Sequence, residues 1–92
     1  MEHKEYDMME IKILGTGCPK CKRLTQLTHE ALEAVGTEAT IVKVTDLEEI
    51  MAFDVMATPG LVIDGQVVSA GRLPRRGEIE SWLREASSQG DA

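Results

Sequence analysis

The chain has 92 residues, of which 42% are hydrophobic and only 3% aromatic, and its formal net charge at pH 7 is -6. This length accommodates one domain with one modest core, which Leu, Ile, Val, Ala and Met must fill because aromatic side chains are scarce. The negative charge excludes a broad nucleic-acid surface, which needs clustered basic residues. No stretch approaches the ~20 consecutive apolar residues of a membrane span, so we expect neither nucleic acid nor membrane as a partner.

The two ends of the chain are expected to be tails. Residues 1–8 are polar and charged, without the apolar run of a secretory signal, which favours a flexible N-terminal tail on a cytoplasmic protein. We expect the domain over residues 9–88 and a short C-terminal tail over 89–92. Two cysteines are too few for a disulfide scaffold, and a bridge between Cys18 and Cys21 would close only a tiny loop. A role for this pair would therefore lie in thiol chemistry and not in stabilising the fold.

The first half of the chain predicts a strand, a helix and a second strand. A β-rich run over residues 10–14 ends at Gly15-Thr16-Gly17. The helix begins at Pro19, which suits a first turn, and ends before Gly36, a typical C-terminal cap. Residues 39–44 are rich in β-branched side chains and predict the second strand. The helix has one apolar stripe, made of Leu24, Leu27, Ala31 and Val35.

The second half predicts a short helix, a hairpin and a last helix. Thr45 and Glu48 fit a capping box that opens the short helix, which must end before Pro59. Asp64-Gly65 between two β-rich runs is the clearest hairpin signal in the chain. The last helix begins near Pro74. The short helix carries three apolar residues, Leu47, Ile50 and Met51. The hairpin strands cover residues 61–63 and 66–69. One side of the last helix is apolar, with Ile79, Trp82, Leu83 and Ala86.

The predicted order is therefore strand–helix–strand–helix–strand–strand–helix. The first strand–helix–strand unit should form a parallel pair with a right-handed crossover. The hairpin should extend the same sheet with antiparallel strands. We predict one compact α/β domain of βαβαββα order, with a four-stranded mixed sheet flanked by helices on both faces.

Cys18 and Cys21 lie where the first strand passes into the first helix. Residues three apart at a helix start lie on the same side, close enough for a disulfide to form and break. The unpaired N–H groups of the first turn stabilise an anion, which favours the thiolate of Cys18. We therefore expect Cys18 to attack a substrate disulfide and Cys21 to resolve the mixed disulfide. The alternative is a pair of buried cysteines that only fill the core.

The residues beside the two cysteines are candidates for tuning their reactivity. Pro19 limits backbone freedom between the cysteines. Lys20, together with Lys22 and Arg23, adds positive potential to the same helical turn. The alternative for these three cations is a solvated helix face, since charges near a helix tip act over a short range.

Two segments resemble the halves of a thioredoxin-fold active site: Gly17-Cys18-Pro19-Lys20-Cys21 after a strand, and Thr58-Pro59-Gly60 before the hairpin. Over roughly residues 9–86, the chain is similar to the short thioredoxin- and glutaredoxin-like redox-active disulfide proteins. The resemblance implies a thioredoxin-like fold, a cis Pro59 that faces the cysteines, and substrate backbone that pairs with Thr58 like an added strand. Without the resemblance, Pro59 reads as an ordinary proline at a strand start.

The chain also departs from that family's pattern. Gly17 stands where thioredoxin has Trp, and Pro19-Lys20 stands where it has Gly-Pro. Lys12 aligns near thioredoxin's buried Asp, so no residue of this sequence evidently assists the proton transfer that this Asp assists in thioredoxin. The Gly-Gly signature with which glutaredoxins bind glutathione is not visible around residues 70–72. The departures leave the predicted fold intact but do not identify the reductant.

Four further residues have ordinary interpretations. His29 is expected on the surface or at its boundary, and Trp82 in the core as the anchor of the last helix. Met51 and Met56 carry thioethers that bind soft metals, yet packing in the core is the preferred interpretation. Beyond solvation, we assign no role to the two arginines that open the last helix, Arg75 and Arg76.

The function we predict is that of a protein-disulfide oxidoreductase. It exchanges the Cys18–Cys21 dithiol or disulfide with protein disulfides through a mixed disulfide, without a metal or a cofactor beyond that disulfide. Its expected partners are protein substrates and an unidentified reductase, and we expect a monomer. The alternatives are a copper chaperone that uses the same two cysteines, and a non-catalytic domain whose cysteines report redox state. Pro19, Thr58-Pro59 and the strand order argue against the chaperone.

Overall fold

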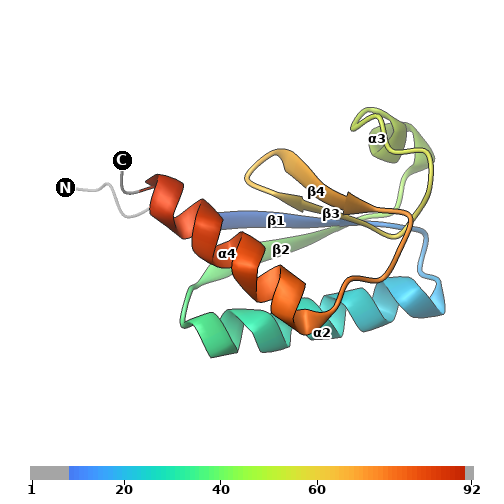
Figure 1. The fold of residues 1–92 in the computed structure, drawn as a ribbon. Coiled ribbons are helices and arrows are strands. Elements are labelled where there is room, and N and C mark those ends of the chain that lie inside the picture. Colours follow the sequence, from blue (N-terminus) through green and yellow to red (C-terminus); the bar gives the residue numbers. More distant parts are fainter. Residues whose placement is uncertain (1–8, 91–92) are drawn as a thin grey trace.

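The computed structural model describes residues 9–90, so the predicted N-terminal tail and the last two residues of the predicted C-terminal tail lie outside it. Within these residues the elements follow the predicted order (Figure 1). The strands are β1 (Met9–Leu14), β2 (Ala39–Val44), β3 (Gly60–Ile63) and β4 (Gln66–Ala70). The helices are α2 (Pro19–Val35), α3 (Leu47–Met51) and α4 (Arg76–Gly90). The α/β fold class is confirmed.

The four strands form one mixed sheet with the order β2-β1-β3-β4. β1 and β2 are parallel, while β1 pairs with β3 and β3 with β4 in antiparallel fashion. Parallel neighbours need a crossover connection, and α2 supplies it between β1 and β2. The backbone N–H of Gly15 donates to the carbonyl of Val44 over 3.0 Å, so the pairing continues one residue beyond β1.

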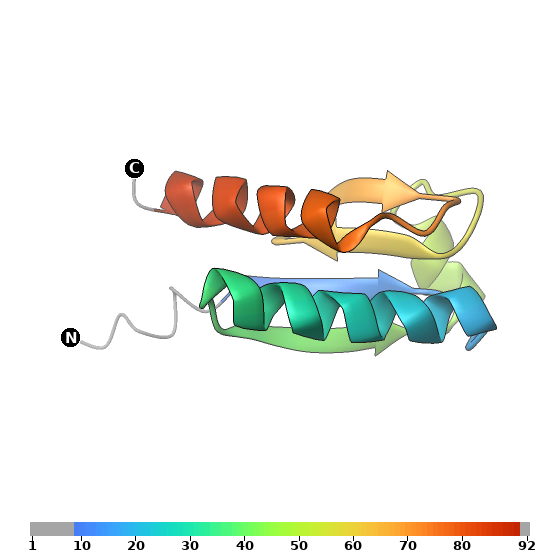
Figure 2. The ribbon, with the colours of Figure 1, turned by 60° about the horizontal axis from the view of Figure 1, so that its bottom comes forward.

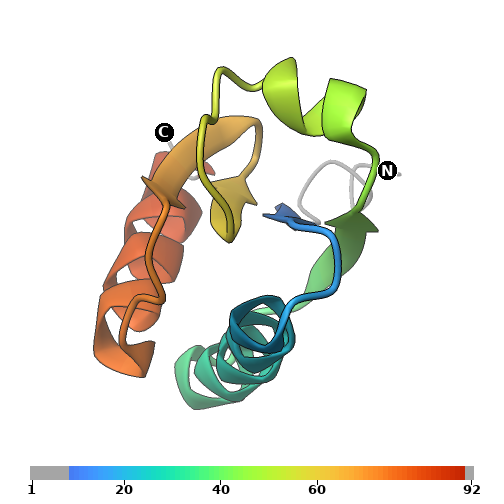
Figure 3. The same cartoon turned by 90° about the vertical axis from the view of Figure 1, so that its right-hand side faces the viewer.

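Helices cover both faces of the sheet, as predicted. α2 and α4 lie side by side on one face, and α3 lies on the other (Figures 2 and 3). Because side chains alternate along a strand, β1 and β3 each contribute buried residues to both layers of the core. The α2 and α4 layer contains Met9, Ile11, Ile13, Leu24, Leu27, Ala31, Leu32, Leu61, Ile63, Ile79 and Leu83. The α3 layer contains Leu14, Val44, Ile50, Val55 and Val62, with Phe53 packed against them.

The predicted limits and stripe of α2 are confirmed. Pro19 occupies its first turn, and Gly36 caps its end in the left-handed region at φ 82°. The Gly36 N–H donates to the Leu32 carbonyl over 2.8 Å, which satisfies one of the last orphan carbonyls of the helix. Of the predicted stripe, Leu24, Leu27 and Ala31 are buried, and Val35 packs against the core from its edge.

The predicted N-terminal cap of α3 and the expected core packing of Met51 are wrong. Asp46, not Thr45, caps the helix, because its carboxylate accepts the Glu48 N–H over 3.1 Å. Five residues make little more than one turn, so the helix presents only Ile50 to the sheet. Leu47 is 61% exposed and Met51 is 65% exposed.

Core packing is also the wrong interpretation for the second methionine, since Met56 is 97% exposed. It lies in the connection between α3 and β3, which crosses the end of the sheet (Figure 3). The other two side-chain expectations hold: His29 is exposed on α2, and Trp82 is partly buried against the larger core layer.

The predicted hairpin is confirmed in detail. Asp64 and Gly65 both have positive φ, 50° and 84°, as a two-residue type I′ turn requires. Asp64 also ties the turn to β1, because its carboxylate accepts the Glu10 N–H over 2.9 Å and its own N–H donates to the Glu10 carbonyl over 2.8 Å.

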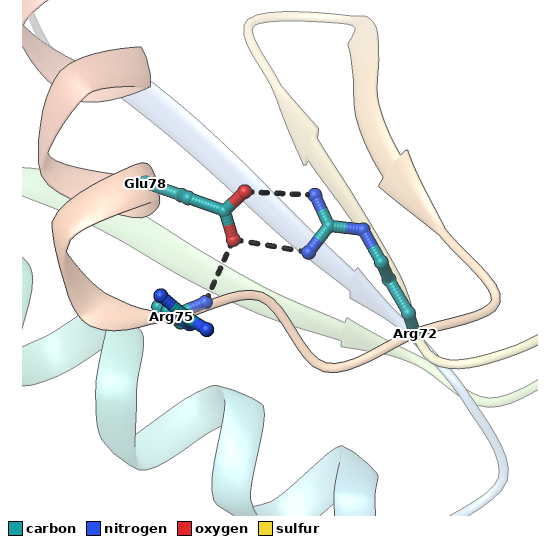
Figure 4. A network of polar contacts seen from close by, with 3 residues as sticks. All are labelled: Arg72, Arg75 and Glu78. Carbon is teal, nitrogen blue, oxygen red and sulfur yellow. Dashed lines mark hydrogen bonds and ion pairs between the residues drawn. The ribbon is translucent and has the colours of Figure 1, made fainter.

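The start of α4 is organised by Glu78 rather than left to solvent (Figure 4). Its two carboxylate oxygens each accept a hydrogen bond of 3.0 Å from the Arg72 guanidinium, and one also accepts the Arg75 N–H over 2.9 Å. Glu78 thus makes the return half of a capping box on Arg75. Arg76 pairs with Glu80 on its own helix and with Glu30 on α2, at 3.3 and 3.7 Å. Solvation alone was therefore too weak an interpretation of the Arg76 side chain, while Arg75 contributes its backbone N–H to the cap.

This capping contact predicts a pH dependence of stability. The hydrogen bonds from Arg72 and from the Arg75 N–H lower the pKa of Glu78 to about 2. A depressed carboxyl pKa stabilises the fold above the unfolded value of about 4.3, and this stabilisation is lost as pH falls toward 2. We expect Glu78→Gln to remove that part of the decline in unfolding free energy, measured by urea titration at pH 6, 4 and 3. Glu33→Gln, at an exposed position of α2, is the matched control and should preserve the decline.

Candidate active site

Cys18 is the N-terminal cap of α2. Its backbone is extended, with φ -69° and ψ 164°, and its sulfur accepts the backbone N–H of Cys21 over 3.2 Å. The sulfur therefore occupies the place where a capping serine or aspartate oxygen usually lies, at the positive end of the helix. The Cys18 carbonyl accepts the Lys22 N–H over 3.1 Å and begins the helical hydrogen bonds. This geometry stabilises a thiolate at position 18.

Cys21 lies one turn further into the helix and is buried, with 5% of its surface exposed. Gly15 makes room for it, because a Cβ at position 15 would overlap the Cys21 sulfur. No disulfide joins the two cysteines in the structure. The pair therefore combines a partly accessible sulfur at the helix tip with a sheltered one behind it.

The segment before β3 lies beside this pair. The Thr58–Pro59 peptide bond is cis, the isomer that the resemblance implied, and Pro59 is fully buried. The Pro59 carbonyl accepts the Gly71 N–H over 3.0 Å, which ties the segment to the end of β4. A Cβ at Gly15 would lie 3.9 Å from the Thr58 Cβ, so the exposed Thr58 borders the same glycine that accommodates Cys21.

The surroundings of the two thiols shift their pKa values in opposite directions. The hydrogen bond from the Cys21 side chain, followed by backbone N–H groups of the first turn, lowers the pKa of Cys18 below its ordinary value. Burial raises the pKa of Cys21, and its hydrogen bond to Cys18 acts in the same direction. The pair therefore favours one thiolate at Cys18 and one protonated thiol at Cys21, which is the division that disulfide exchange requires.

Sequence comparison assigns this arrangement to a family. The family model described as thioredoxin domain matches residues 9–84. The chain belongs to the thioredoxin family. It is 43% identical over 77 residues to a thioredoxin of Methanocaldococcus jannaschii, covering 84% of this chain and 88% of the relative. It is 36% identical over 76 residues to a thioredoxin of Methanothermobacter thermautotrophicus, covering 83% and 99%.

Solved structures show the same fold at low sequence identity. Thioredoxin-2 of the malaria parasite, described as a component of its protein secretion machinery, has a TM-score of 0.63 and 12% identity over 85% of this chain and 82% of that one. The oxidised thioredoxin of Plasmodium falciparum has a TM-score of 0.53 and 18% identity over 96% and 91%. The thioredoxin-like fold of the described residues is therefore confirmed.

Membership of the thioredoxin family confirms the predicted activity. The protein is a thiol–disulfide oxidoreductase that acts on protein disulfides, and Cys18 and Cys21 form its CxxC pair. Neither the family model nor the two relatives support a copper carrier. Within residues 9–90, no group of three or more His, Cys, Asp or Glu side chains gathers as a metal site. None of the helices described is long and apolar enough to cross a membrane.

One departure from the thioredoxin pattern has a structural explanation. Lys12, which aligns near the buried Asp of thioredoxin, is half-buried on β1 with its ammonium 5.4 Å from the centre of the Phe53 ring. This cation–π contact places the Lys12 ammonium beside Phe53, which packs against the α3 layer of the core. The position aligned with the thioredoxin Asp is therefore occupied by a cation that contacts an aromatic ring, and not by a carboxylate.

Sequence reasoning missed two features around the thioredoxin site. The first is the steric requirement for glycine at position 15, for which the sequence offers only an indirect indication, the Gly-Thr-Gly loop before Cys18. The second is the close approach of Gly71 to the cis-proline segment. A Cβ at Gly71 would lie 3.2 Å from the Ala57 Cβ, and nothing in the sequence indicates this contact. Both contacts depend on how a loop folds back on itself, between Gly15 and Cys21 and between Ala57 and Gly71, and local periodicity carries no information about them.

Proposed function

We propose that Cys18 is the nucleophile of this oxidoreductase and Cys21 its resolving residue. The observation that carries the proposal is the position of the Cys18 sulfur at the helix cap, where it accepts the Cys21 N–H over 3.2 Å. Cys18 is also the more accessible of the two side chains, since Cys21 is buried. A substrate sulfur can therefore approach Cys18 from solvent, while Cys21 lies buried behind it.

The exchange proceeds in two steps that transfer two electrons. The Cys18 thiolate attacks one sulfur of the substrate disulfide, and the other substrate sulfur leaves as a thiolate that takes up a proton. Cys21 then loses its proton and attacks the Cys18 sulfur. The Cys18–Cys21 disulfide forms and the second substrate sulfur leaves as a thiol. The substrate is reduced, the protein is oxidised, and a reductase restores the dithiol.

Thr58 and Pro59 are proposed to receive the substrate backbone. The hydrogen bond from the Gly71 N–H to the Pro59 carbonyl ties this segment to the end of β4, and the exposed Thr58 borders Gly15 next to Cys21. An extended substrate segment laid along Thr58 would pair with it as an added strand. Such pairing positions the substrate disulfide without selecting its side chains.

Pro19 and Lys20 are proposed to tune the nucleophile. Pro19 holds the first turn of α2, and the Lys20 backbone N–H is one of the groups that lower the pKa of Cys18. We further propose that the Cys18–Cys21 disulfide is the only redox group of the protein. The protein is proposed to act as a monomer, with protein disulfides as substrates and a reductase as electron donor. Its proposed location is the cytoplasm, where cysteine pairs serve in disulfide exchange more often than in structural disulfides.

Trapping tests the two roles. Full-length Cys21→Ser, incubated with oxidised insulin as the probe, is expected to accumulate a mixed disulfide that survives a non-reducing gel and disappears with dithiothreitol, because the resolving thiol is absent. Cys18→Ser is the matched control and should form no such complex. Trapping by Cys18→Ser but not by Cys21→Ser would reverse the assigned roles.

A further inference from the structure

Two methionine side chains lie on the surface beside the thiol site. Met56 is 97% exposed and Met51 is 65% exposed, whereas Met9 belongs to the larger core layer and is 5% exposed. Met51 and Met56 line the same groove of about 570 Å³, which also includes Leu47 and Thr58 in its lining. We call it the α3 groove. Packing within this chain therefore does not cover the Met56 thioether, and it leaves most of Met51 open to solvent.

The α3 groove borders the thiol site through Thr58. Thr58 belongs to its lining and also lies next to Gly15, against which the Cys21 sulfur packs. In Figure 1, α3 lies at the same end of the sheet as the passage from β1 into α2, where the cysteines are located. Figure 3 shows α3 on the side of the sheet opposite α2 and α4, so neither long helix covers the groove. A chemical change at Met56 is therefore a change at the edge of the active site.

The reactive group that these two positions present to solvent is a thioether. A peroxide transfers one oxygen atom to the thioether sulfur and converts methionine, which is flexible and apolar, into methionine sulfoxide, which is polar. Access from solvent decides which methionines of a folded protein react, because the oxidant does not reach a buried sulfur. The exposures therefore rank Met56 first, Met51 second and Met9 last.

We propose that Met56, followed by Met51, is a site of oxidation by hydrogen peroxide, and that its sulfoxide slows the reaction of this protein with protein disulfides. The Met56 sulfur attacks one oxygen of the peroxide and the O–O bond breaks. The second oxygen leaves as water, because it takes up the proton of the transferred oxygen. The thioether loses two electrons and the peroxide gains them, so no thiol is consumed.

The loss of rate rests on the proposed function, in which the substrate backbone lies along Thr58. A segment laid there continues past Ala57 and Met56, which line the same groove. The sulfoxide oxygen is a hydrogen-bond acceptor that holds water at this surface, and covering it without a new partner costs free energy. A small disulfide that reaches only Cys18 covers no part of the groove. The modification therefore slows protein substrates and spares small ones.

The modification also outlasts the thiol cycle. When Cys18 and Cys21 are joined as the disulfide, the protein carries no thiolate, and the exposed thioethers are the sulfurs that a peroxide oxidises first. A reductase then restores the dithiol but leaves the sulfoxide, whose removal needs a separate methionine sulfoxide reductase. Met56 therefore keeps a record of peroxide exposure after the cysteine pair has returned to its reduced state.

Peptide mapping tests the site of oxidation. The full chain is first converted to its Cys18–Cys21 disulfide, which protects both thiols, and is then treated with hydrogen peroxide, which catalase removes. Mass spectrometry is expected to show Met56 oxidised at least about tenfold faster than Met9, with Met51 between them. Oxidation of Met9 as fast as Met56 would contradict the difference in access on which the proposal depends.

Two disulfide probes test the consequence. The treated protein is reduced with dithiothreitol, which restores the thiols, and its kcat/KM is measured with insulin and with dithiobis(nitrobenzoate), a small aromatic disulfide. Complete oxidation of Met56 should lower the insulin value about threefold and leave the value for the small disulfide unchanged. An unchanged insulin value would overturn the proposal. An equal loss with both probes would also overturn it, because the damage would then lie at the thiols or in the fold.

Matched leucine variants assign the effect to one sulfur. Leucine is apolar and similar in volume to methionine, but it has no sulfur to oxidise. After the same treatment, Met56→Leu should retain at least about four-fifths of its own untreated insulin value, while Met9→Leu should lose as much as the wild type. A loss in Met56→Leu equal to that of the wild type would place the effect at another residue and contradict the proposal.

Failure of the proposed function looks different. It is tested without peroxide, and turnover of insulin by Cys18→Ser would remove the nucleophile assignment whatever the state of Met56. The peroxide experiments instead compare treated and untreated protein with both thiols intact, so a negative result there removes only the role of the methionine.

Discussion

Replacement of Cys18 by serine is expected to lower the rate of protein-disulfide reduction at least about a thousandfold, because the attacking sulfur is lost. The serine hydroxyl can still cap α2, so the fold is expected to persist. Insulin reduction with dithiothreitol as electron source measures the rate, and urea unfolding of the same sample measures the fold. A large loss of rate with little loss of unfolding free energy assigns the effect to chemistry.

The matched comparison for this prediction is Cys21→Ser. It keeps the nucleophile, so it should still react once with an oxidised substrate and then stall, whereas Cys18→Ser should not react at all. Residual turnover by Cys18→Ser above about a tenth of the wild-type rate would show that Cys21 attacks substrates directly. The burial of Cys21 argues against that route.

Replacement of Gly15 by alanine is expected to destabilise the protein by about 1–3 kcal/mol and to slow the resolving step, because the new Cβ would overlap the buried Cys21 sulfur. Gly15 has no left-handed backbone, so overlap alone causes the effect. Urea unfolding measures the destabilisation. The fraction of enzyme held as mixed disulfide during insulin reduction measures the resolving step, and it should rise.

Gly77→Ala provides the control for that prediction. A Cβ at Gly77, in the first turn of α4, would meet no atom within 4 Å, and alanine is the better helix former. The expected result is an unchanged or slightly higher unfolding free energy, by up to about 1 kcal/mol, with unchanged kinetics. If Gly15→Ala behaves like Gly77→Ala, the close contact between Gly15 and Cys21 does not constrain the site.

The elements that sequence predicts well are those whose signals are local. Asp64-Gly65 specifies a two-residue turn by its tolerance of positive φ, and the structure has that turn. The 17-residue helix α2 repeats its apolar spacing over several turns, so its buried face could be identified before the structure was known. The cysteine pair follows from the same logic, since its place at a helix start was readable from the loop and Pro19.

The errors concern α3 and the contacts between distant segments. In a helix of five residues the apolar spacing does not repeat, so it could not show that Ile50 turns inward while Leu47 and Met51 face solvent. The groove that these side chains form with Met56 depends on how the connection crosses the end of the sheet. The pairing of Arg72 with Glu78 likewise depends on a loop conformation that no residue pattern encodes.

The most direct test of the account is the pH dependence of alkylation of each cysteine in the reduced protein. Alkylation by iodoacetamide is followed at each cysteine by peptide mass spectrometry. The rate at Cys18 should follow a pKa below that of free cysteine, which is about 8.5, and the rate at Cys21 should follow a pKa above that value. In Cys21→Ala the pKa of Cys18 should rise, because the Cys21 thiol no longer donates to it. A Cys18 that titrates like free cysteine, or above Cys21, would contradict the proposed division between nucleophile and resolving thiol.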